Sequence, residues 1–201
     1  MSAKAYQGLA AIAGVCLVTA CQSTPATHYY TLAEIVPTAA AAGAAAAPPI
    51  RVERITIPGE LDRLDLVRHD SGNRLQIATF ERWAAPLDAM IRTVVTADLA
   101  ARLAVGSVAG ANEPAVGEPR RQLYIDIREF AGDERGAVKL RATWLLQTPN
   151  KASERGSADI TAQASAASAD TLASAMSRAL ADLSAQIAAT ITAQPAGEKS
   201  E

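Results

Sequence analysis

Cysteine and histidine have the side chains of this chain that could most readily do chemistry at neutral pH, and each occurs twice. Cys16 lies inside an uncharged run, residues 8–20, and Cys21 follows directly after it. His28 and His69 have no further histidine, aspartate or glutamate at a spacing typical of metal ligands. No Gly-x-Ser-x-Gly sequence is present. The sequence therefore predicts that the protein is not an enzyme, and Cys21 is the residue with a definable chemical role.

The first 20 residues have the layout of a secretory signal peptide. Lys4 precedes the uncharged run of thirteen residues, which closes on small side chains. This run is too short to cross about 30 Å of hydrocarbon, which takes roughly 20 residues. Val18-Thr19-Ala20-Cys21 resembles the lipobox of bacterial lipoproteins. That resemblance implies cleavage before Cys21, a diacylglycerol on its thiol and an N-acyl chain such as palmitate on its new amino group.

Lipidation of Cys21 would remove the last free thiol, because Cys16 leaves with the signal peptide. The acyl chains would hold the protein on a membrane, since each buried methylene contributes about 0.8 kcal/mol. Gln22, rather than aspartate, follows Cys21, which by analogy with enterobacterial sorting favours the periplasmic face of the outer membrane. Two alternatives remain at this point: an ordinary signal peptide, or an apolar run that stays as an anchor.

The remaining 181 residues suffice for one domain with its own core. They contain 18 basic and 21 acidic residues, a net charge of −3, which gives no electrostatic indication of nucleic-acid binding. Composition divides them into a lipidated tether at 21–27, a single domain at 28–192 with an Ala/Pro-rich insertion at 37–49 and a mobile loop at 106–119, and a disordered tail at 193–201.

β-branched and aromatic runs predict strands at 28–32, 50–58, 64–70, 73–80, 121–130, 137–147 and 155–164. Arg54 interrupts the alternation of its strand, which indicates a bulge or an edge position. The last three strands alternate apolar and polar residues cleanly, as in an antiparallel meander with one buried and one solvated face. Arg128, Arg141, Asp126 and Asp159 fall on the solvated face.

Apolar residues spaced three and four apart predict helices at 85–103 and 169–192, with Pro86 at the first helical position and Asp170 as an N-cap. Asp98 and Arg102 are expected to form a partly exposed pair, and a buried functional carboxylate is the alternative. The element order predicts an α+β fold, a mixed and largely antiparallel sheet with two helices packed on one face as a two-layer sandwich.

Three short segments carry a resemblance to a known family. The chain reads His-Tyr-Tyr-Thr-Leu at 28–32, Pro-Gly-Glu-Leu-Asp-Arg at 58–63 and Trp-Ala-Ala-Pro-Leu at 83–87. In this order after a lipobox they resemble the ABC-type transport auxiliary lipoproteins, the PqiC/YmbA family of MCE transport systems. Ala85 stands where that family usually has glutamate, so a required chemical role for the glutamate is not expected here.

The resemblance implies a non-catalytic auxiliary subunit of an ABC/MCE-type intermembrane lipid transport system that supports the cell envelope. The implied partners are an MCE-domain conduit protein, an inner-membrane permease, in many systems an ATPase, and further copies of the chain. No cofactor is implied beyond the acyl groups on Cys21. Tyr29, Tyr30, Arg128 and Arg141 are the candidate partner contacts. The alternatives are a lipid-binding carrier with its own apolar cavity and a structural envelope lipoprotein.

Overall fold

A computed structural model describes residues 25–35, 49–70, 73–103, 107–110 and 121–193. The predicted signal peptide, Cys21, the tail from 194 and nearly all of the insertion at 37–49 lie outside the described residues. Of the predicted mobile loop at 106–119, only 107–110 are described.

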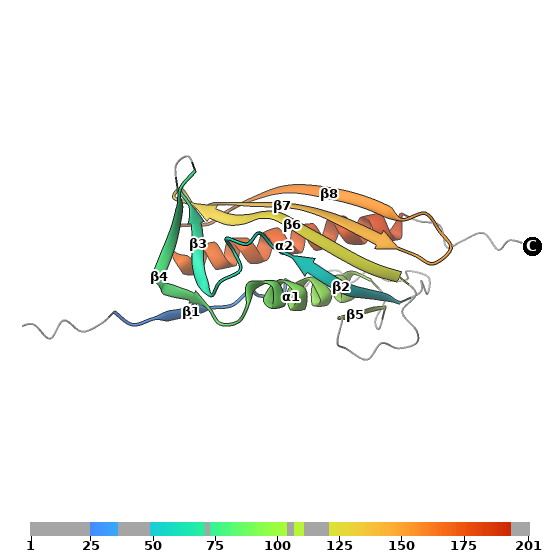
Figure 1. Ribbon diagram of the computed structural model, residues 1–201, viewed down its shortest axis with the longest axis horizontal. Coiled ribbons are helices and arrows are strands. Elements are labelled where there is room, and N and C mark those ends of the chain that lie inside the picture. The colour runs from blue at the N-terminus through green and yellow to red at the C-terminus, as the bar shows by residue number, and fades with distance from the viewer. Residues whose placement is uncertain (1–24, 36–48, 71–72, 104–106, 111–120, 194–201) are drawn as a thin grey trace, which may run out of the picture.

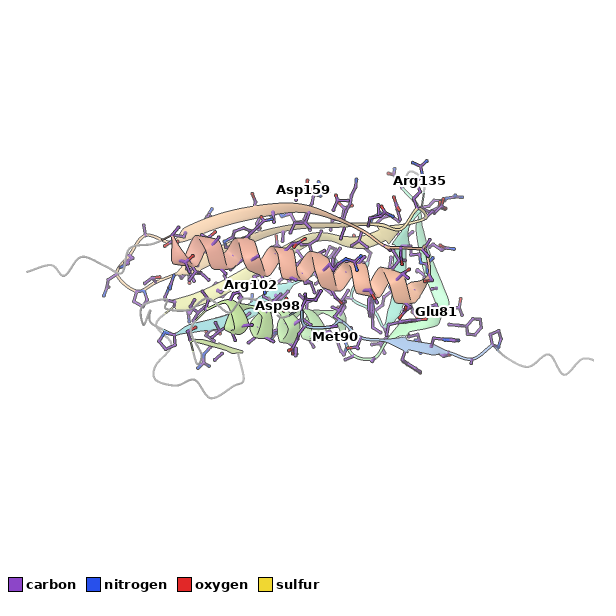
Figure 2. The ribbon with its side chains drawn as sticks, turned by 180° about the vertical axis from the view of Figure 1, so that it is seen from behind. Glu81, Met90, Asp98, Arg102, Arg135 and Asp159 are labelled. Carbon is purple, nitrogen blue, oxygen red and sulfur yellow. The ribbon has the colours of Figure 1, made fainter. Side chains whose placement is uncertain are left out.

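The described residues form eight strands and two helices, an α+β fold as predicted. The strands belong to one mixed sheet (Figure 1). Their bounds are β1 His28–Tyr30, β2 Ile50–Thr56, β3 Asp65–His69, β4 Leu75–Trp83, β5 Val108–Gly110, β6 Arg121–Asp133, β7 Ala137–Gln147 and β8 Glu154–Gln163. The helices are α1, Leu87–Arg102, and α2, Ala169–Thr192. Both helices pack on the same face of the sheet, as the view from behind shows (Figure 2).

The longest ladders of the sheet are antiparallel. β6 pairs with β7 and β7 with β8 along nearly their whole length, and β3 pairs with β4. The shorter ladders are parallel: β2 and β3 both lie along the other edge of β6, β5 pairs with β2, and β1 with β4. A register shift after Val52 confirms the bulge predicted at Arg54.

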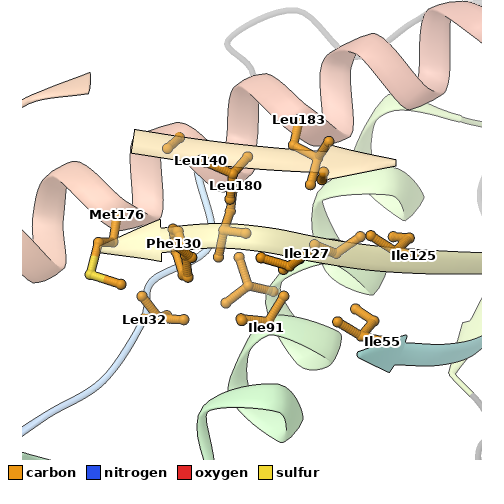
Figure 3. Close-up of a cluster of buried hydrophobic side chains, with 14 of the residues drawn as sticks. Leu32, Ile55, Ile91, Ile125, Ile127, Phe130, Leu140, Met176, Leu180 and Leu183 are labelled. Carbon is orange, nitrogen blue, oxygen red and sulfur yellow. The ribbon is translucent and has the colours of Figure 1, made fainter. Parts of the chain in front are cut away.

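The predicted alternation is confirmed on β6, β7 and β8. Their inward-facing side chains are at most 9% exposed and form the sheet side of the core; they are Leu123, Ile125, Ile127, Val138, Leu140, Ala142, Trp144, Leu146, Ala158, Ile160 and Ala162. The stripe of α2 closes over them, with Leu180 and Leu183 against the sheet, and Ile91 of α1 enters from the side (Figure 3). Each fully buried aliphatic side chain contributes roughly 1.5–3 kcal/mol, so this cluster holds sheet and helices together.

Tight turns join the antiparallel strands. Between β6 and β7 the Asp133 Oδ1 accepts hydrogen bonds from the backbone N–H groups of Arg135 and Ala137, both at 2.8 Å. Gly136 follows with φ of 79°, a conformation that glycine adopts without the steric cost of a Cβ. This turn fixes the register of the hairpin, so that inward residues of β6 oppose inward residues of β7.

Three local predictions are wrong. Val108–Gly110 were assigned to the mobile loop at 106–119, but they form β5, which pairs with β2. Asp170 is not the N-cap of α2: Ser168 is, and its Oγ accepts from the N–H of Thr171, which lies at the third helical position. Pro86 is the N-cap residue of α1 rather than its first helical residue, because its ψ of 132° is extended.

Candidate functional site

Charged side chains collect on the face of the sheet that is turned away from both helices. Arg128 Nε lies 3.1 Å from Asp126 Oδ2, and Arg141 Nε lies 2.7 Å from Glu129 Oε2. Asp159 of β8 points away from α2 on this same side (Figure 2). We call this surface the outer face. Exposed ion pairs contribute about 0–1 kcal/mol, so these pairs organise the outer face more than they stabilise the fold.

A groove of about 560 Å³ crosses the outer face between β2, β6, β7 and β8. Strand register builds it, because Arg54 pairs with Tyr124 and Arg155 with Leu145, and paired residues point to the same face. Its lining residues are Arg54, Thr56, Tyr124, Ile125, Asp126, Arg128, Thr143, Trp144, Leu145, Arg155 and Gly156. We call it the outer groove.

The outer groove carries positive charge that the fold does not neutralise. Asp126 is already engaged, since its Oδ1 accepts from Thr56 Oγ1 at 2.7 Å and its Oδ2 pairs with Arg128. Within the described residues, the exposed side chains of Arg54 and Arg155 have no hydrogen-bond or ion-pair partner. Guanidinium groups bind carboxylate and phosphate bidentately, so the groove suits an anionic group flanked by apolar surface.

The four predicted contact residues lie in two places. Arg128 lines the outer groove, and Arg141 lies on the outer face beside it. Tyr29 and Tyr30 lie on β1, which pairs with β4 at a different part of the sheet. The sequence reasoning missed Arg54 and Arg155 as candidates, although the alternation of β8 already pointed Arg155 outward with Asp159.

Tyr29 and Tyr30 differ in their surroundings. The side chain of Tyr29 is 64% exposed, whereas Tyr30 packs against the core. A hydrogen bond from the Tyr30 hydroxyl to the Glu81 carboxylate, followed by partial burial, raises the pKa of Tyr30 to about 12. Tyr30 therefore joins β1 to β4 as a structural residue, and only Tyr29 presents its ring to the outside.

Residues 31–35, which follow β1, bridge the two helices. The N–H of Ala33 donates to Ser177 Oγ of α2 at 3.0 Å, and the N–H of Ile35 donates to Asp98 Oδ1 of α1 at 3.1 Å. We call residues 31–35 the strap. Shallow grooves of about 450 and 500 Å³ lie on its two sides, against α1 and α2.

The expected partly exposed pair between Asp98 and Arg102 is not formed. Asp98 is fully buried, and its Oδ2 has no hydrogen-bond partner in the described structure. The Arg102 guanidinium instead donates to the backbone oxygens of Asp98 and Ala181, at 3.2 and 3.1 Å (Figure 2). Burial raises the pKa of Asp98 above its ordinary 3.8, while the Ile35 hydrogen bond and the charge of Arg102 oppose that rise. Asp98 thus holds the strap in place through a hydrogen bond, and we do not assign it a ligand-binding role.

The described residues provide neither a cluster of metal ligands nor a helix suited to crossing a membrane. The described part of the chain holds no group of three or more His, Cys, Asp or Glu side chains placed to bind a metal ion. His28 pairs with Glu81 and His69 with Leu75, on different strands. Neither α1 nor α2 combines the length and apolar character that crossing a membrane requires.

Comparison with known proteins agrees with this architecture. A family model described as "ABC-type transport auxiliary lipoprotein component" matches residues 30–188. The "Intermembrane transport lipoprotein PqiC" proteins of Escherichia coli (strain K12) and Shigella flexneri are each 33% identical over 95 residues, which is 47% of this chain and 49% of theirs. The chain thus aligns with about half the length of these curated relatives.

Two crystal structures share the fold. One, of an uncharacterised protein, has a TM-score of 0.69 at 23% identity and covers 83% of this chain and 99% of its own. The other, of a Xanthomonas campestris protein, has a TM-score of 0.65 at 18% identity and covers 83% of this chain and 95% of its own. At these identities the likeness concerns the fold alone.

Proposed function

Because the chain belongs to the ABC-type transport auxiliary lipoprotein family, we propose that it is a non-catalytic subunit of an ABC/MCE-type intermembrane lipid transport system. In this proposal Cys21 carries a diacylglycerol and an N-acyl chain, which anchor the domain on the periplasmic face of the outer membrane. The sequence supports this with the signal peptide layout of residues 1–20 and with Gln22 after the cysteine.

The unpaired arginines of the outer groove are the observation that carries a partner-binding role. Arg54 and Arg155 face solvent from two different strands, and the apolar surface of Leu145 and Tyr124 lies between them. This arrangement would offer an acidic segment of another subunit both charge pairing and apolar contact. We propose that this segment belongs to the MCE-domain conduit protein.

Tethering gives this subunit its effect on the complex. The acyl chains would hold the domain on the outer membrane while the outer groove binds the conduit protein. This tethering would raise the effective concentration of the conduit's tip at the outer membrane. The inner-membrane permease, and the ATPase where one is present, would act at the opposite end of the conduit. The chain then needs no catalytic group of its own, only an anchor and a docking surface.

Photo-crosslinking in cells of the native host tests this function. A photoreactive amino acid at Leu145 in the outer groove should capture an MCE-domain protein, identified by mass spectrometry. The double variant R54E/R155E should lose most of that capture, because two favourable charges become repulsive. The control K139E reverses an exposed charge on β7 outside the groove and should retain capture. Failure to capture an MCE-domain protein from Leu145, with the variant expressed and folded, contradicts the proposal.

The carrier alternative makes a different prediction about the core. The outer groove and the two grooves beside the strap all open at the surface. The core between sheet and helices is filled by side chains such as Phe130, Leu140 and Leu180, which are at most 1% exposed. A carrier requires an apolar cavity of some hundreds of cubic ångströms. Stoichiometric lipid extracted from purified, anchor-free protein would favour the carrier over the docking subunit.

A further inference from the structure

Large apolar side chains reach the surface at one end of the molecule. Among the described residues, those that are exposed are Tyr29 at 64%, Leu64 at 39%, Leu75 at 40% and Ile77 at 45%. Tyr29 lies on β1, Leu64 just before β3, and the other two on β4. Figure 1 shows β1, β3 and β4 together at one end of the long axis, and the C-terminal end of α2 at the other. We call these four side chains the end patch.

The end patch follows the length of β4. Leu75 and Ile77 are alternate residues and so point to the same face of the strand. Tyr29 pairs with Arg82 near the other end of the same strand. Nine residues of strand span about 30 Å, so the patch is a line rather than a compact cluster. Exposed polar residues border the line: Gln76 points to the opposite face of the strand, and Thr79 follows Ile77 at the next alternate position.

The predicted anchor lies next to this patch. Seven residues, 21–27, separate the start of the tether from His28, the first residue of β1. Fully extended they reach about 25 Å, and less when coiled. The end formed by β1, β3 and β4 is therefore the part of the domain that the tether keeps close to a bilayer.

We propose that the end patch rests on the bilayer surface, with β4 lying along it and the long axis of the domain standing away from it. This rests on the membrane anchoring of the proposed function. A narrow line of apolar side chains bordered by exposed polar ones suits the headgroup region, where a tyrosine places its ring in the apolar layer and its hydroxyl in water. Four side chains offer much less than the roughly 800 Å² per partner of a typical stable protein interface.

The orientation has a consequence for the rest of the surface. The turn between β7 and β8, which contains Lys151, lies at the opposite end of the molecule and would point into the periplasm (Figure 1). The outer groove lies on a face of the sheet that would not touch the bilayer in this orientation, so it would stay accessible to a partner. Membrane contact and partner contact would use different surfaces.

The experiment imposes the tether chemically, so that its result does not depend on acylation in the cell. The chain from Cys21 to Glu201 contains every described element and the whole core, and Cys21 is its single cysteine. Its thiol is coupled to maleimide-headgroup lipids in phosphatidylethanolamine/phosphatidylglycerol vesicles, and amide hydrogen exchange is compared with that of the same chain capped and free in solution. Peptides from 28–30 and 73–80 should exchange more slowly on vesicles, and the turn at 148–153 should be unchanged.

Two variants separate the patch from general crowding at the surface. L75T/I77T replaces two exposed apolar side chains by threonine, a polar β-branched residue that favours strands, so the strand should persist while the added protection at 73–80 is lost. L145T makes the same change on the outer face of β7 and should leave that protection intact. Equal exchange of the 73–80 peptides on vesicles and in solution overturns the proposal.

A second copy of the chain is the competing occupant, because residues 75–77 of β4 pair with β3 alone in the described structure and leave their other edge open. Tenfold dilution of the coupled chain with bare lipid distinguishes the two. Protection that stays constant on dilution supports bilayer contact, whereas protection that falls with surface density shows self-association and rejects it. If the 73–80 peptides are protected on vesicles but Cys21 proves unacylated in the native host, the proposed anchoring fails while the affinity of the end patch for a bilayer stands.

Discussion

Asp98 is the clearest case of a single residue whose environment changes its expected properties. Its spacing to Arg102 suggests an exposed ion pair, but the residue is fully buried and holds the N–H of Ile35 through Oδ1. A buried carboxylate with one unpartnered oxygen is costly when charged, which is why its pKa is raised. We infer that the folded protein as a whole is most stable when Asp98 is protonated, because burial disfavours the carboxylate more than the hydrogen bond from Ile35 favours it.

The substitution D98N tests this through pH dependence. Because the folded-state pKa of Asp98 is raised, the folded protein binds its proton more readily than the unfolded chain does. The stability of the wild type relative to D98N should therefore be greatest below pH 3.8 and decline as pH rises through the folded-state pKa. Urea unfolding of both proteins between about pH 3 and pH 7 measures the difference. A difference that is constant, or that grows with pH, would refute this assignment.

Truncation of the same side chain tests the hydrogen bond to the strap. D98A leaves the half-buried N–H of Ile35 without its acceptor, which costs about 1–3 kcal/mol of unfolding free energy. D98N keeps an amide oxygen at that place and should cost less. Denaturation at one pH, with amide exchange of residues 31–35 as a local readout, compares the two variants; equal losses would show that the Ile35 contact is unimportant.

The packing of β7 against β8 depends on one glycine. Gly156 pairs with Trp144, and a Cβ at this position would overlap the indole ring. Trp144 is 6% exposed, so its ring has little room to move aside. The close approach of these two residues lets the large indole ring cover the core between β6 and β8.

G156A is accordingly expected to destabilise the protein by about 1–3 kcal/mol, the usual cost of overpacking. G59A is the matched control, because a Cβ at Gly59 meets no atom within 4 Å, and its stability should change little. Chemical denaturation of both variants is the measurement. Equal stability of the two would mean that Trp144 repacks freely.

The elements that could be predicted from the sequence are those with a regular pattern of apolar residues. Clean alternation gave β6 to β8, and the apolar stripe of Leu172, Leu180 and Ile187 gave α2, because periodicity records which side faces the core. β5 was missed because three residues are too short to show a period. The parallel ladders join segments far apart in the chain, so no local pattern reports them. The outer groove could be predicted only in part. Strand alternation places Arg128 and Arg155 on the outer face, but the pairing register is needed to bring Arg54 next to them.

One hydrophobic cluster connects both helices and the sheet from Leu32 to Ile191 across the whole molecule. It includes Trp83 near β1 and Trp144 on β7, which lie in different parts of the sheet. A domain with a single continuous core unfolds as one unit, since loss of packing at one end exposes apolar surface at the other. The same rigidity would let an anchor at one end set the orientation of the outer groove.

Single-tryptophan variants test this cooperativity. W83F and W144F each leave a single tryptophan. Within each variant, tryptophan fluorescence and far-ultraviolet circular dichroism should give the same denaturant midpoint. Phenylalanine retains most of the apolar contact, so the fold should survive each change. Midpoints that differ between fluorescence and circular dichroism in either variant would indicate two independently unfolding parts.

Mass spectrometry of the N-terminal peptide from the native host tests the membrane-anchored role most directly. We predict a chain that begins at Cys21, bearing a diacylglycerol on the thiol and an acyl group on the α-amino nitrogen. Recovery of an unmodified Cys21, or of a chain that retains residues 1–20, would contradict the proposed anchor and with it the role at the outer membrane.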